Sequence, residues 1–179
     1  LAEFMLFTSG AIQRLGSVKD GTTTSDYDPL EVERHMGINL SLLPIQWQEM
    51  KLNLIDTPGY ADFIGEVRSG LRVTEGAIIV ICAASGVEVG TEQMWNDAEK
   101  ANLPRLIFVN KMDRDNADFF STLEGIQAKL SSKCLPLQLP IGSQKDFQGI
   151  IDLVSMRAYI GADSKEAEIP SALRKQAEV

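Results

Sequence analysis

The chain has 179 residues, of which 44% are apolar, and a net charge of −8. These values suit one domain, or one domain plus part of a second, with a sizeable core. The negative net charge argues against nucleic-acid binding by the surface of this chain, because such binding relies on clustered Lys and Arg. The longest apolar run, AIIVICAA, is far below the roughly 18 residues that span a bilayer, and no basic region precedes the first apolar residues. We therefore expect a cytoplasmic protein that binds neither membranes nor DNA.

The two cysteines, Cys82 and Cys134, form neither a metal-ligand spacing nor a disulfide framework. We interpret both as buried apolar side chains.

The first part of the chain predicts a helix, a long loop and a hairpin. Apolar residues at helical spacing predict a helix over residues 1–8, which Gly10 is placed to end. Residues 16–33 are polar, rich in Thr, Asp and Gly, and without sustained periodicity, which indicates a long mobile loop. Residues 40–47 and 51–55, joined by a short polar link, indicate an antiparallel hairpin.

Helices and strands alternate over the middle of the chain. In chain order we expect a helix over 64–74, a strand over 77–83, a helix over 91–102, a strand over 105–109 and a helix over 116–133. Thr91 is a suitable N-cap for the second helix. Both strands are continuous apolar runs, as strands buried on both faces require. The alternation predicts an α/β fold with a mostly parallel sheet and helices on both faces.

After Cys134 the pattern changes to short extended pieces, followed by a polar tail and a short helix over 171–178. We place a domain boundary near Leu135, which separates residues 1–134 from residues 135–179.

Asp56, Thr57, Pro58 and Gly59 follow the strand at 51–55. Asp56 offers a carboxylate to a magnesium ion, through water, because hard cations prefer such oxygens. Gly59 can bring its backbone N–H against a terminal phosphate, where a side chain would obstruct the approach. The alternative is an ordinary turn after a strand.

Asn110, Lys111, Met112 and Asp113 follow the strand at 105–109. Guanine offers two N–H donors to a carboxylate such as Asp113, and an acceptor edge to an amide such as Asn110, while the Lys111 stem can lie along the base. The alternative is a solvated charged loop. Ligands bind at the carboxyl ends of the strands in such sheets, so we expect both groups of residues on one rim.

In this order and setting, the two motifs resemble those of translational GTPases, in particular elongation factor G and its paralogues. The resemblance runs nearly end to end, through LAEFMLFTSGAI, DTPGYADF, FVNKMDR and LPLQLPIG. It implies a P-loop NTPase-like fold, with residues 135–179 as the start of an inserted α+β subdomain. It also implies GTPase activity, GTP or GDP and magnesium as ligands, and the ribosome as the partner of the full-length protein.

Three departures from the family pattern stand out. The phosphate loop, of the form GxxxxGK[ST], is expected immediately before LAEF, so residues 1–134 are expected to be a GTPase core without its first strand and phosphate loop. Such a chain should bind nucleotide weakly and be inactive alone.

The second departure is Tyr60, which stands where the family has a histidine that helps to position the attacking water. A phenol does not become a cation near neutral pH, so we expect slower hydrolysis; alternatively, Tyr60 only packs against its neighbours.

The third departure concerns the family pattern RGITI, whose threonine binds magnesium. An ungapped alignment puts Gly37 at that place, whereas a shifted register presents Asn39 or Ser41. His35, the lone histidine, is interpreted as a loop residue.

The sequence thus predicts the GTP-hydrolysing domain of an elongation-factor-G-like ribosomal factor, acting in translocation or recycling. One alternative is a GTP-dependent ribosome-binding module that hydrolyses slowly or not at all, and another is a folded scaffold.

Overall fold

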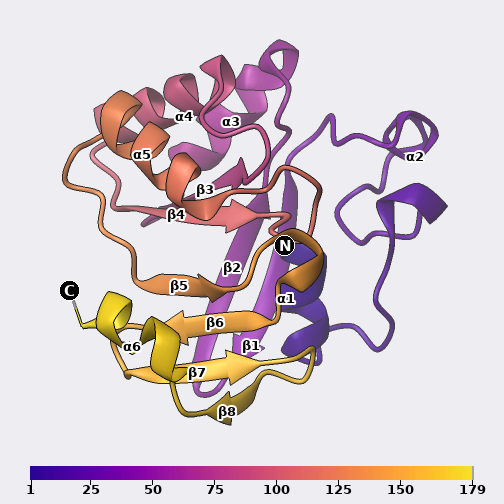
Figure 1. Cartoon of the computed structure of the whole chain (residues 1–179). Helices are drawn as coiled ribbons and strands as arrows, with labels where there is room; N and C mark the ends of the chain where they lie inside the picture. The colour runs from indigo at the N-terminus through magenta and orange to yellow at the C-terminus, as the bar shows by residue number, and fades with distance from the viewer. Residues whose placement is uncertain (179) are drawn as a thin grey trace. The chain divides into compact units, whose positions relative to one another are not determined.

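The computed structural model describes residues 1–178, so that Val179, the end of the predicted 135–179 subdomain, lies outside the described residues. Backbone contacts divide the chain into two units, and Figure 1 labels the elements of both. Unit 1 holds Leu1–Ala77 and Asp97–Pro104, and unit 2 holds Ile78–Asn96 and the chain from Arg105 onward. This division does not fall at residue 134, and the boundary predicted there stays a prediction.

A hairpin and three helices lie in unit 1. They are α1 (Ala2–Thr8), α2 (Pro29–Arg34), β1 (Ser41–Trp47), β2 (Met50–Asp56) and α3 (Ile64–Leu71).

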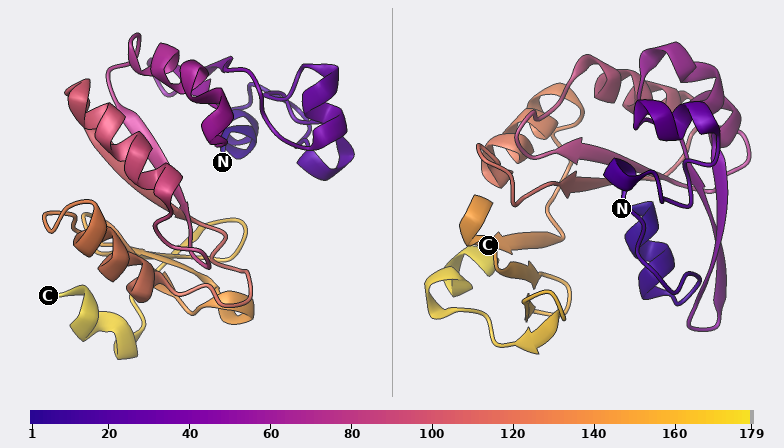
Figure 2. Two further views of the ribbon diagram at one scale, coloured as in Figure 1. Left: turned by 90° about the horizontal axis from the view of Figure 1, so that it is seen from above. Right: turned by 90° about the vertical axis from the view of Figure 1, so that its right-hand side faces the viewer.

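The β1–β2 hairpin confirms the predicted antiparallel pair, and its strands are paired along their whole length. Alternate residues of β1 are buried, and Leu43 and Ile45 pack with Leu6 of α1. Figure 2 shows α1 lying beside the hairpin. The helix ends as predicted, because Gly10 follows its last turn with φ of 75°, a conformation that glycine adopts without steric cost.

The region predicted to be an irregular loop contains a single helical turn at Val18–Asp20 and the helix α2, so that prediction is wrong for residues 18–20 and 29–33. The Asp28 carboxylate accepts a hydrogen bond from Leu30 N, and Glu31 accepts one from Asp28 N. Pro29 occupies the first helical position, where its missing N–H costs nothing. This reciprocal capping starts α2 although the helix is only six residues long.

The remaining elements follow α3 in chain order. They are β3 (Ala77–Cys82), α4 (Val89–Lys100), β4 (Arg105–Asn110), α5 (Phe119–Lys129), β5 (Gln138–Ile141), β6 (Gly149–Asp152), β7 (Arg157–Ile160), β8 (Lys165–Ala167) and α6 (Ser171–Ala177).

β3 and β4 pair in parallel, as the sequence predicts. Ala77 N donates to Pro104 O, and Ala83 N donates to Asn110 O. The register therefore advances by the same number of residues along both strands, which defines a parallel pair.

One face of the β3–β4 pair is buried. Ile79 and Ile81 pack there with Trp95 of α4 and Ile126 of α5, and the half-buried thiol Cys134 packs against this cluster. Cys82 is also half-buried rather than buried as predicted, and both thiols are free.

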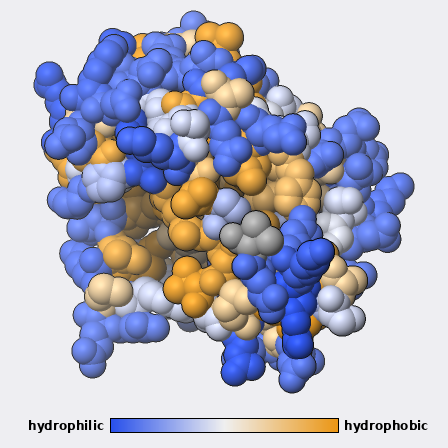
Figure 3. Space-filling view, turned by 60° about the vertical axis from the view of Figure 1, so that its left-hand side comes forward, coloured by the Kyte–Doolittle hydropathy of each residue, from blue (hydrophilic) through white to orange (hydrophobic). Residues whose placement is uncertain are grey.

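The opposite face of the β3–β4 pair is exposed. Its large side chains are Ile78, Val80, Leu106 and Phe108, which are 38–48% exposed. The prediction that these strands are buried on both faces therefore holds for one face. Figure 3 shows that hydrophobic residues reach the molecular surface among hydrophilic ones.

The starts of α4 and α5 differ from the predictions. α4 begins at Val89, so Thr91 lies inside the first turn and is not the N-cap. Its Oγ1 instead accepts a hydrogen bond from Glu88 N at 3.3 Å. α5 begins after Asp118, whose carboxylate accepts from Ser121 N at 3.0 Å. A side-chain acceptor, rather than hydrophobic periodicity, sets where this helix starts.

The last four strands form an antiparallel sheet in the order β5–β6–β7–β8. Ile151 and Ala158 are fully buried, and Leu173 of α6 packs against their cluster. The predicted extended pieces and terminal helix are confirmed. Within residues 1–178, every helix is too short or too polar to cross a membrane.

Candidate functional site

A cavity of about 200 Å³ in unit 1 is lined by the long loop after α1 and by residues at the end of β2. Its lining consists of Val18, Ser25, Asp26, His35, Met36, Gly37, Asn39, Ser41, Asp56, Thr57, Pro58 and Gly59. All four predicted residues of the DTPG motif are among them. Pockets for whole drug-sized ligands measure roughly 300–1,000 Å³, so this cavity suits phosphate groups and a cation rather than an entire nucleotide.

Asp56 is the last residue of β2 and is half-buried. Burial raises the pKa of its carboxyl, while a hydrogen bond with the Ser25 side chain opposes the rise. The nearby carboxylate of Asp26 raises the pKa further. Two carboxylates therefore share the cavity, and the charge of Asp26 makes ionisation of Asp56 less favourable.

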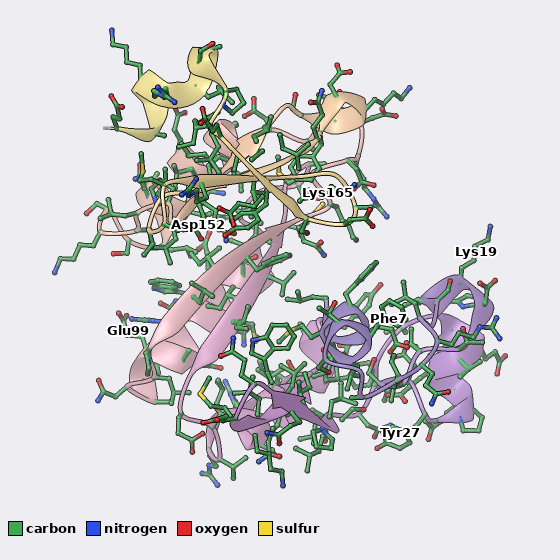
Figure 4. The ribbon with its side chains drawn as sticks, turned by 90° about the horizontal axis from the view of Figure 1, so that it is seen from below. Phe7, Lys19, Tyr27, Glu99, Asp152 and Lys165 are labelled. Carbon is green, nitrogen blue, oxygen red and sulfur yellow. The ribbon has the colours of Figure 1, made fainter. Side chains whose placement is uncertain are left out.

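The lining is suited to a hard cation. It contains two carboxylates, an amide and several hydroxyl groups, but neither Lys nor Arg. Lys19, next to the lining residue Val18, extends away from the ribbon (Figure 4). These oxygen ligands fit magnesium, which Asp56 would hold directly or through water. Such an ion would neutralise the charge of phosphate oxygens.

No cluster of three or more His, Cys, Asp or Glu that could bind a metal occurs within residues 1–178. A magnesium ion here would therefore need water or phosphate oxygens to complete its six ligands.

Gly59 lines the cavity with its backbone accessible. An added Cβ would meet no heavy atom within 4 Å, so space lies beside this residue for a ligand. The predicted approach of a phosphate to Gly59 N–H stays a prediction.

The three residues considered for the place of the family's threonine all line the cavity. Gly37 offers only backbone groups, and a Cβ there would lie 3.6 Å from Asp26 Oδ1. Ser41 Oγ donates to Ser25 O, and Asn39 Nδ2 donates to Glu31 Oε1 at 3.4 Å. The two possible registers both stay open.

Tyr60 lies just beyond the cavity lining and is 58% exposed. Its carbonyl accepts from Phe63 N at 3.1 Å and starts a single helical turn at Ala61–Phe63. Its predicted action on water stays a prediction. His35 follows the last residue of α2 with φ of 52°, and its Nδ1 lies 2.9 Å from Val18 O, so its contacts are those of a loop residue.

The NKMD motif lies in unit 2 and forms a turn after β4. Arg114 N donates to Lys111 O at 3.2 Å, and Lys111 has φ of 61°. Met112 is buried with Ala117, whereas Asp113 is exposed. The methionine therefore anchors the turn, and the carboxylate is available to a ligand.

Asn110, the first residue of the motif, ends β4, and its carbonyl accepts from Ala83 N at 2.9 Å. The DTPG and NKMD motifs belong to different units, so the shared rim stays a prediction.

Sequence reasoning missed three residues of this region, namely Ser25, Asp26 and Glu31. Asp28, Pro29 and Glu31 carry a recognisable capping signal, which predicts the helix. Ser25 and Asp26 carry no local signal, because only the folding of the loop brings them to Asp56.

The fold and the cavity together define a P-loop NTPase-like α/β protein, as the sequence predicts. Residues 1–173 match the family model described as "Elongation factor Tu GTP binding domain", and the chain belongs to that family.

The similar proteins are much longer than this chain. Elongation factor G of Thermotoga petrophila is 44% identical over 182 aligned residues, which cover 99% of this chain and 26% of that protein. Elongation factor G of Thermotoga neapolitana is 43% identical, with the same coverage. A crystal structure from Thermus thermophilus superposes with a TM-score of 0.93 at 34% identity, over 99% of this chain and 27% of that one. The chain thus spans about a quarter of the length of these relatives.

Proposed function

We propose that this chain is the GTP-binding and GTP-hydrolysing part of an elongation-factor-G-like translation factor. Within the longer protein it acts on the ribosome in the cytoplasm, in translocation or recycling. Residues 1–134 supply the GTPase core, and residues 135–179 begin an inserted subdomain.

The observation that carries this proposal is the position of Asp56 to Gly59. These residues end a strand and line an oxygen-rich cavity whose other walls come from a long loop. In GTPase switches, loops held by the terminal phosphate and its magnesium ion are released by hydrolysis. The cavity has the composition that such a contact needs.

Base selection is assigned to the turn at Asn110, Lys111, Met112 and Asp113. The exposed Asp113 carboxylate accepts from two guanine N–H groups, which adenine does not offer in the same arrangement. Asn110 and the Lys111 stem complete the contact, and Met112 holds the turn through its buried side chain.

Titration with a fluorescent guanine nucleotide tests the binding step on this chain. We expect weak binding that strengthens with magnesium and that GTP and GDP displace better than ATP. Equal displacement by ATP would contradict the proposal. Single-turnover GTP hydrolysis by the longer protein, with and without ribosomes, tests the second step.

A second candidate is a GTP-dependent ribosome-binding module that hydrolyses slowly or not at all. It is favoured by Tyr60, whose side chain is exposed and outside the cavity lining, and by Gly37, which offers no side-chain oxygen. Ribosome-stimulated hydrolysis separates the candidates, because only the first predicts a rate that ribosomes increase.

A further inference from the structure

Glu31 is a buried carboxylate that accepts hydrogen bonds from residues of its own loop. Its side chain is 0% exposed, although glutamate is almost never fully buried unless it is paired. Oε2 accepts from Asp28 N at 2.9 Å, and Oε1 accepts from Ile38 N and Asn39 N, both at 2.8 Å. These short bonds from backbone N–H groups compensate the buried charge.

The carboxylate remains ionised in this setting. Burial raises the pKa of Glu31, but the hydrogen bonds from Asn39, Asp28 and Ile38 outweigh burial and leave the pKa below its ordinary value. The single side chain thereby joins the start of α2 to a segment beyond its end.

This segment is one wall of the cavity described above. Gly37 and Asn39 line the cavity and flank Ile38, whose N–H is bound to Glu31. Peptide units are planar, and within the described residues none is cis. Fixing the N–H groups of Ile38 and Asn39 therefore also fixes the directions of the Gly37 and Ile38 carbonyls, which point away from the carboxylate.

We propose that Glu31 is a positioning residue, which holds Gly37 to Asn39 in place as a wall of the cavity. The identity of the cavity's ligand rests on the function proposed above. The hydrogen bonds themselves do not depend on it.

Hydrogen exchange of the whole chain without nucleotide tests the contact. We expect Glu31→Ala to speed exchange of the Ile38 and Asn39 amides by about tenfold or more, the factor that loss of one charge-assisted hydrogen bond produces. Amides of β1 in the same experiment report whether the fold is intact. Glu33→Ala is the matched control, because Glu33 is exposed on the same helix. Wild-type exchange at both amides in Glu31→Ala would overturn the proposal.

Glu31→Gln separates positioning from simple stabilisation. The amide oxygen can still accept from Ile38 and Asn39, but the amide NH₂ then faces Asp28 N–H, donor against donor. We expect exchange to accelerate at Asp28 and to stay nearly unchanged at Ile38 and Asn39. If Glu31→Ala does not fold, this variant decides alone, and wild-type exchange at all three amides, Asp28, Ile38 and Asn39, overturns the proposal.

Binding of magnesium–GDP supplies the functional measurement. We expect Glu31→Ala to weaken it by about tenfold and Glu31→Gln to weaken it less, with the preference for guanine over adenine unchanged. Unchanged affinity in Glu31→Ala would overturn the positioning role. A wild-type chain that binds no guanine nucleotide would overturn the proposed function, and the exchange experiment would still decide the role of Glu31.

Discussion

Ser41 and Asp56 face each other across the open end of the β1–β2 hairpin, and both line the cavity. Their pairing positions the Asp56 backbone, and hydrogen bonds with the Ser25 side chain and the Thr57 backbone reach the carboxylate. Because burial raises its pKa, the folded chain binds this proton more tightly than the unfolded chain does. The ionised carboxylate therefore lowers the stability of the fold.

We predict that Asp56→Asn stabilises the chain at pH 7 without magnesium. The destabilising effect of the charge is fully present above the raised pKa and disappears as the pH falls towards 3.8, the ordinary value. A gain of about 1 kcal/mol would raise Tm by roughly 2–4 °C in a chain of this size. Asp62→Asn, an exposed control, should leave Tm unchanged.

Magnesium should reverse the order of thermal stability of the wild type and Asp56→Asn. An ion bound by Asp56 stabilises the folded state by mass action, so magnesium should raise the Tm of the wild type and not that of Asp56→Asn. Removing the ion with a chelator should restore the original difference. Equal responses of both proteins would show that Asp56 does not bind the ion.

Acidification should reveal the charge of Glu31. Because its folded pKa lies below 4.5, its contribution to stability is present above pH 4.5 and is lost as the pH falls through the lowered pKa. Glu31→Gln should therefore be less stable than the wild type at pH 6, and the difference should shrink below pH 4.5. Denaturant unfolding at several pH values measures this. Glu33→Gln should show no such convergence.

Base selectivity should depend on Asp113. Asp113→Asn should abolish the preference for guanine nucleotides and favour xanthine nucleotides, because the amide can donate to the xanthine carbonyl. Competition binding measures the change, and Asp115→Asn, exposed in the same turn region, is the control. Unchanged selectivity would mean that Asp113 does not face the base.

Hydrolysis in the longer protein should respond to Tyr60. With ribosomes present, Tyr60→His should raise the single-turnover rate, on the order of 10²-fold, while changing GTP affinity little. A slower rate in Tyr60→Phe would show that the hydroxyl itself orients the water. If neither substitution changes the rate, Tyr60 has no part in the chemistry.

The turn at Gly142 should tolerate no side chain. Its φ is 78°, and an added Cβ would collide with the Asp146 carbonyl oxygen, so Gly142→Ala should destabilise the chain strongly. In contrast, a Cβ at Gly125 inside α5 meets nothing within 4 Å. Gly125→Ala should stabilise the chain by up to about 1 kcal/mol, because alanine favours the helix. Thermal unfolding compares the two variants directly.

Local patterns predicted most elements of this fold. The β1–β2 hairpin, the β3–β4 pair and the last helix each have a periodicity or an apolar run in the sequence, and each forms where that pattern predicts it. Their ends were less predictable, since a single acceptor such as Asp118 sets the start of α5. Thr91 has the chemistry of an N-cap, but the chain enters α4 two residues earlier.

The candidate site was predictable only where it follows the strands. Asp56 and Gly59 stand directly after a run that predicts a strand, and their motif signals chemistry. Ser25 and Asp26 reach Asp56 through a long loop whose path has no periodicity, so no sequence spacing indicates their approach. The role of Glu31 was predictable in part, because its capping pattern predicts a helix but not the hydrogen bonds to Ile38 and Asn39.

The exposed face of the β3–β4 pair should govern the colloidal behaviour of the chain. Four large apolar side chains, among them Ile78 and Phe108, meet water there, while the molecule carries a net charge of −8. At low ionic strength, mutual repulsion keeps copies apart. Added sulfate shortens the range of that repulsion and strengthens apolar association, so light scattering should increase with salt. Purification in dilute buffer should therefore give the most monodisperse sample.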